Sequence, residues 1–99
     1  MKYLTLWEMN MARFPSDPAE SGKIMMKLVE MTKQWGKENP GDEWGKFLGE
    51  NKGYSIVNGT QEKIMKLSMM FSPFVEFKVF QAVTINEVEA AMKTMMPTG

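Results

Sequence analysis

The chain has 99 residues, 12 basic and 12 acidic side chains, and neither Cys nor His. This length predicts one domain, residues 1–99, that buries its own core. The balanced charge offers no basic surface for nucleic acid. The missing residue types exclude disulfides, thiolate catalysis, Cys-based metal sites and a haem held by a proximal His. They also remove the commonest general base, and we expect no cofactor, no metal and no nucleic-acid partner.

No stretch of the chain predicts a targeting signal or a membrane span. The apolar run near the N-terminus is short and is interrupted by Glu8, which does not fit the core of a signal peptide. No apolar run reaches the length that crosses a bilayer. We expect a cytoplasmic protein with no membrane partner.

Residues 2–9 alternate in the manner of a β-strand. Leu4 and Leu6 share one face, and their purely aliphatic character favours packing against helices. The opposite face carries Tyr3, Thr5, Trp7 and Met9. Aromatic walls with a few hydroxyl groups are typical of a small-molecule pocket. The alternative is a packed dimer core without a cavity.

The next element is a helix that begins after Asp17. Asp17 is a good N-cap, Pro18 suits the first helical position, and Glu20 fits a capping box. Apolar residues recur at helical spacing and predict a buried stripe of Ile24, Leu28, Met31 and Trp35, with Met25 and Thr32 beside it. Gly36 is the expected C-terminal cap.

Two short strands, 43–49 and 54–58, follow as a hairpin with its turn at 50–53. A second helix is expected over 61–71, with Thr60 as its N-cap and Pro73 after its end. A strand over 75–85 comes next. A terminal helix, 86–96, then begins at Asn86, because Asn86 and Glu89 have the spacing of a capping box.

The element order predicts an α+β, ferredoxin-like βαββαβ plait with a four-stranded antiparallel sheet and an extra C-terminal helix. Right-handed crossovers place both main helices on one face of that sheet. The other face is left bare, yet the first and last strands are apolar on both faces. A second copy of the chain is the simplest cover, so we expect a homodimer paired through the sheet face as a dimeric α/β barrel.

Three stretches carry a resemblance over nearly the whole chain: YLTLWEM, GKFLGENKGYSIVNG and FSPFVEFKVFQAVTINEVEAAM. The sequence resembles the dimeric α/β-barrel superfamily, and within it a family of small bacterial and archaeal proteins of uncharacterised function. Other branches of that superfamily include cofactor-independent monooxygenases, haem-degrading enzymes, muconolactone isomerases and stress-response barrels. The resemblance implies a fold and a dimer more than a chemistry.

The candidate ligand-binding residues lie on three of the expected strands. A pocket in the barrel would be lined by Tyr3, Thr5, Trp7, Trp44 and Gln81. Instead of binding a ligand, Gln81 could form hydrogen bonds with nearby backbone or water, or lie at a sheet edge. Trp44 could equally fill the dimer interface. We expect a small apolar or aromatic ligand, with monooxygenase-like or isomerase-like activity left open. The alternative is a non-catalytic dimeric interaction module with a filled barrel.

The acidic residues near strand ends form no recognisable catalytic pair. They are Glu8, Asp42, Glu43, Glu50 and Glu76. A lone carboxylate at a strand end is usually solvated, so we expect these side chains to be exposed and assign no catalytic residue.

Overall fold

The computed structural model describes residues 1–96. Its elements are β1 (Lys2–Met9), the short 3₁₀ helix η1 (Met11–Arg13), α1 (Pro18–Glu38), β2 (Glu43–Lys46), β3 (Lys52–Asn58), α2 (Gln61–Phe71), β4 (Val75–Ala82) and α3 (Ile85–Met95). The strands form one sheet in the order β2-β3-β1-β4, and every neighbouring pair is antiparallel. The expected α+β class and four-stranded antiparallel sheet are confirmed, and the strand order is compatible with a ferredoxin-like plait.

The first helix begins where the sequence predicts and ends later. Asp17 caps its start, because the side chain accepts a hydrogen bond from the backbone N–H of Ala19 at 3.2 Å. The helix continues past Gly36, so the expected cap there is wrong. Asn39 is the observed cap: its backbone N–H and its side-chain amide both donate to the carbonyl oxygen of Trp35, at 2.8 and 3.0 Å. These two bonds satisfy a carbonyl that the helix end would otherwise leave free.

Three other predicted boundaries also move. The strand β2 stops at Lys46 and β3 starts at Lys52, so the turn is earlier than 50–53. The strand β4 ends at Ala82, and α3 is capped by Thr84 instead of Asn86. Thr84 and Glu87 form a complete capping box, each side chain accepting from the other's backbone N–H at 3.1 Å.

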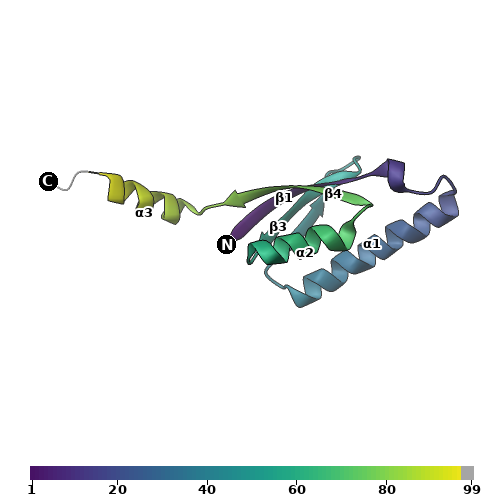
Figure 1. The fold of residues 1–99 in the computed structure, drawn as a ribbon, viewed down its shortest axis with the longest axis horizontal. Helices are drawn as coiled ribbons and strands as arrows, with labels where there is room; N and C mark the ends of the chain where they lie inside the picture. Colours follow the sequence, from purple (N-terminus) through teal and green to yellow (C-terminus); the bar gives the residue numbers. More distant parts are fainter. Residues whose placement is uncertain (97–99) are drawn as a thin grey trace.

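The two main helices lie on the same side of the sheet (Figure 1). The side that they cover carries Tyr3 and Thr5, both buried, whereas Leu4 and Leu6 are 38% and 37% exposed on the other side. The expectation that Leu4 and Leu6 face the helices is therefore wrong. The hydroxyl groups of Thr5 and Ser55 bond to each other across adjacent strands. This pairing satisfies both hydroxyl groups, which are fully buried.

The core lies between that face and the helices. It contains Tyr3, Trp35, Val57, Ile64, Leu67 and Phe71. The second helix contributes three of these residues, Ile64, Leu67 and Phe71, which are spaced so that they share one helical face. The first helix contributes only Trp35, near its C-terminal end, and its more N-terminal stripe residues are half-buried.

The last helix does not belong to this body. It projects from the end of β4, away from the sheet and from both other helices (Figure 1). The described chain therefore extends over 69 Å in one direction but only 25 and 23 Å in the others.

Candidate functional site

A cavity of about 390 Å³ lies on the helix-covered side of the sheet, under the middle of α1. Its lining is mostly apolar and aromatic, which is the usual character of a small-molecule site. It is formed by Trp7, Met9, Met25, Leu28, Val29, Thr32, Trp44, Gly45, Lys46, Asn51, Phe71 and Val75.

The helix α1 supplies one wall. Its contributions are Met25, Leu28, Val29 and Thr32, which are spaced so that they share one face of the helix. The Thr32 hydroxyl donates to the Leu28 carbonyl oxygen at 2.8 Å. This bond keeps the hydroxyl hydrogen engaged and leaves a largely apolar surface toward the cavity.

The sheet contributes Trp7, whose indole ring lies over Gly53. A Cβ atom at Gly53 would overlap that ring and the carbonyl oxygen of Gly45. The ring nitrogen Nε1 of Trp7 donates to the carbonyl oxygens of Gly45 and Tyr54, each at 3.1 Å. Glycine at position 53 thus allows the close approach, and the two hydrogen bonds hold the indole in place as part of the cavity wall.

Trp44 forms another part of the lining. Its ring packs against Phe71 and Phe77, with ring centroids 5.6 and 6.4 Å apart. Its Nε1 atom is buried and is the single buried side-chain polar atom without a hydrogen-bond partner among residues 1–96. Leaving such a donor unpaired costs about 1–3 kcal/mol, so a ligand that supplied an acceptor would gain that amount.

The structure brings together two of the five sequence-predicted site residues. Trp7 and Trp44 both line the cavity. Tyr3 is in the core instead, with its hydroxyl donating to Met1 Sδ at 3.4 Å, and Thr5 is engaged with Ser55. Gln81 lies on the edge strand β4 with its side chain exposed. The predicted pocket face was therefore assigned to the wrong side of the sheet.

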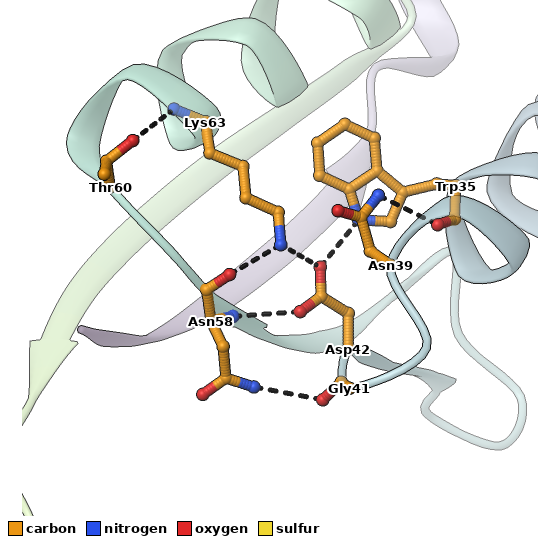
Figure 2. Close-up of polar contacts among 7 residues, drawn as sticks. All are labelled: Trp35, Asn39, Gly41, Asp42, Asn58, Thr60 and Lys63. Carbon is orange, nitrogen blue, oxygen red and sulfur yellow. Dashed lines mark hydrogen bonds and ion pairs between the residues drawn. The ribbon is translucent and has the colours of Figure 1, made fainter.

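A buried polar cluster joins the two turns at the other end of the helix layer (Figure 2). The Asp42 carboxylate accepts hydrogen bonds from Trp35 Nε1 and from the backbone N–H of Asn58, both at 2.9 Å. Lys63 Nζ lies 2.9 Å from the same carboxylate and also donates to the Asn58 carbonyl oxygen. The Asp42 side chain is 1% exposed, so the expectation that it is solvated is wrong.

These contacts set the protonation of Asp42. Burial by itself raises the pKa of this carboxyl group, because it disfavours the charged form. The hydrogen bonds from Asn58, Lys63 and Trp35, together with the charge of Lys63, outweigh burial and lower the pKa below 3.8. Every partner in the cluster is satisfied, and the cluster lies apart from the cavity. We assign it to stability.

The comparisons with known proteins give no relative from which a function could be transferred. Neither the family models nor the curated proteins include a match to this chain. Within residues 1–96, no helix combines the length and apolar character needed to cross a membrane. The cavity and the exposed surfaces are therefore the features of this chain that bear on its function.

Proposed function

We propose that this protein binds a small apolar or aromatic molecule in the cavity between α1 and the sheet. The observation that carries the proposal is the cavity itself, about 390 Å³ with walls from two tryptophans and several aliphatic and methionine side chains. Small-molecule sites have volumes of about 300–1,000 Å³. A cavity of about 150 Å³ accommodates benzene, so a bicyclic aromatic compound is of suitable size here.

The polar groups around the cavity favour a ligand with one hydrogen-bond acceptor. The Nε1 atom of Trp44 is buried and has no partner, so it would donate to a ligand carbonyl or hydroxyl oxygen once the indole ring turns toward the cavity that it lines. The methionine side chains at positions 9 and 25 adapt to different shapes, because their three rotatable bonds have low barriers. These features support a preference for an aromatic molecule that carries an oxygen.

Binding has more support than catalysis. Of the residues that line the cavity, Lys46 is the only ionisable one. A monooxygenase-like reaction there would require the substrate itself to activate oxygen, and an isomerase-like reaction would require Lys46 to transfer the proton. We therefore propose a binding protein and treat either activity as secondary.

We further propose that the protein is a homodimer, paired through the face of the sheet that the helices leave open, in the manner of a dimeric α/β barrel. We call this surface the open face; its apolar members are Leu4, Leu6, Ile56, Phe80 and Ala82. Tyr54 lies on the same face and donates to Glu43 at 3.0 Å. The hydrogen bond to Glu43 and the negative charge of Glu43 raise the pKa of Tyr54 above 10.0. The Tyr54 hydroxyl therefore stays neutral in such an interface.

A non-catalytic interaction module remains the second candidate, because the open face carries apolar side chains that no helix within residues 1–96 covers, set among charged residues such as Lys78 and Glu76 (Figure 1). The test is native mass spectrometry of freshly purified protein, followed by titration with 2-naphthol while tryptophan fluorescence is recorded. We expect saturable quenching at one site per chain, and a retained small molecule would identify the natural ligand class. Absence of both would reject the cavity as a binding site and favour the interaction module.

A further inference from the structure

The helix α3 is well formed but has no cover in its own chain. Its capping box satisfies the backbone N–H groups of Thr84 and Glu87, and Lys93 pairs with Glu89 at 2.8 Å one turn apart on the helix. Every residue of the helix is exposed, and the helix projects away from the body (Figure 1). An isolated helix of 11 residues is marginal in water. A capped helix of this length therefore needs a surface to pack against.

One side of α3 is suited to such packing. Ile85, Val88, Met92 and Met95 are spaced by three, four and three residues and form one apolar stripe, the α3 stripe. Their side chains are 79%, 39%, 59% and 84% exposed. The opposite side carries Asn86, Ala90 and Thr94. This distribution is that of a helix with one packed side and one solvated side.

The α3 stripe continues the open face along the chain. Phe80 and Ala82 belong to the open face, and α3 begins at Ile85, three residues after Ala82. Three extended residues span about 10 Å. A second copy that covers the open face at this end therefore comes within reach of α3, whereas the helix layer of its own chain lies on the opposite side of the sheet.

The apolar area exposed by the open face and the α3 stripe also favours a second copy of the chain as the partner of α3. A stable pairing usually buries about 800 Å² on each chain. The open face and its neighbour Phe47 expose roughly 300 Å² from Leu4, Leu6, Phe47 and Phe80, which are 38%, 37%, 39% and 52% exposed, if a free side chain of this size has about 150–200 Å². The α3 stripe adds roughly 450 Å² on the same basis. The open face alone falls short of the usual area, and the two surfaces together approach it.

We propose that α3 is an exchanged arm, whose apolar stripe packs on a second copy of this chain as part of the interface formed by the open face. The inference rests on the proposed homodimer and extends it. In a two-fold dimer each arm reaches the other chain, so every contact of α3 occurs twice. The arm then contributes as much to holding the dimer together as the sheet does.

The test compares two substitutions on opposite sides of the same helix. Met92→Glu places a charge in the α3 stripe, and Ala90→Glu places the same charge on the solvated side. Sedimentation equilibrium measures the dimer dissociation constant of each full-length variant. We expect Met92→Glu to raise it by at least about tenfold, because two charges per dimer lose their solvation. Ala90→Glu should change it by less than about threefold. Near-ultraviolet circular dichroism confirms that the body is folded in both.

A third variant separates this inference from the dimer on which it rests. Leu4→Lys places a charge between Ile56 and Phe80 on the open face, far from α3 in the sequence. If Leu4→Lys dissociates the dimer and Met92→Glu does not, the dimer stands and the exchanged arm is wrong. A Met92→Glu protein that stays dimeric but melts earlier would place α3 on its own chain, which also overturns the proposal. A wild-type protein that is monomeric at high micromolar concentration overturns both.

Discussion

The two ends of the helix layer are built differently. At the C-terminal end of α1, Trp35 is buried and donates to Asp42, and the carboxylate is also held by Asn58 at the end of β3 and by Lys63 of α2. Toward the N-terminal end, α1 covers the sheet through Leu28 and Val29, with the cavity beneath them. We call these regions the anchored end and the cavity end. One has all of its polar groups paired, and the other has space and an unpaired Trp44 donor.

This difference separates stability from binding. The contacts of the buried Asp42 carboxylate join the turn before β2 to α1, β3 and α2, so the anchored end contributes to folding whether or not a ligand is present. The cavity end lacks that set of contacts and leaves room for a ligand. Substitutions at the anchored end should therefore change the free energy of unfolding, and substitutions at the cavity end should mainly change affinity.

The largest effect is expected from Asp42→Ala. It leaves Lys63 without its partner and the donors of Trp35 and Asn58 without an acceptor. Breaking a buried ion pair by removing one member costs about 3–5 kcal/mol, and we expect about 3 kcal/mol because Lys63 keeps some access to water. Urea unfolding measures the loss. As a control, Glu50→Ala removes an exposed carboxylate that pairs with Lys52 and should cost less than about 1 kcal/mol. If both variants lost the same free energy of unfolding, the contacts of Asp42 would contribute no more than an exposed ion pair, and the anchored end would have no special role in stability.

A smaller effect, and one on binding, is expected from Val29→Trp. Val29 lines the cavity and is partly exposed, so an indole at this position should pack into the opening. We expect at least about tenfold weaker binding of 2-naphthol, with a change in the free energy of unfolding below about 0.5 kcal/mol. Met26→Trp is the matched control, because Met26 is exposed on the same helix and does not line the cavity. If only the Met26→Trp control bound 2-naphthol more weakly, the binding site would not be the cavity and the proposal would be wrong.

The smallest effect is a pH dependence confined to the anchored end. The pKa of Asp42 is lower in the folded protein than its ordinary value of 3.8. Its contribution to stability is therefore present above pH 3.8 and is lost as the pH falls through the folded pKa. Urea unfolding of the wild type and Asp42→Asn between pH 2 and pH 6 should show a difference in stability that shrinks on acidification. A difference that stays constant over that range would contradict the assigned contacts.

Local patterns in the sequence predict the elements but not which face of the sheet is covered. The helix α2 lies where Thr60, Pro73 and the apolar spacing place it. The strand β1 is apolar on both faces, so alternation shows that it is a strand without showing which face meets the helices. The hydroxyl group of Thr5 led us to predict that it lines a pocket. In the structure this hydroxyl instead bonds to Ser55, which lies on another strand 50 residues away in the sequence.

The cavity and the anchored end depend on contacts that no local pattern contains. Asp42 reads as a turn residue, and its partners Asn58 and Lys63 lie 16 and 21 residues further on. The stripe residues of α1 were predicted to be core, which is correct for Trp35 but not for the residues that line the cavity. The glycine at 53 gave no advance signal of the cavity wall, because the sequence predicts it in a turn, whereas the structure places it in β3, where it makes room for the Trp7 ring.

The central claim is that the cavity end binds a small aromatic molecule while the anchored end does not take part. The three tryptophans allow one measurement to test it, a ¹H–¹⁵N spectrum of the indole N–H groups during titration with 2-naphthol. We predict that the Trp44 signal shifts most, since its N–H has no acceptor, and that the Trp7 signal shifts less. The Trp35 signal, bonded to Asp42, should stay in place. Signals that all remain unchanged, or a Trp35 signal that shifts as far as that of Trp44, would contradict the account.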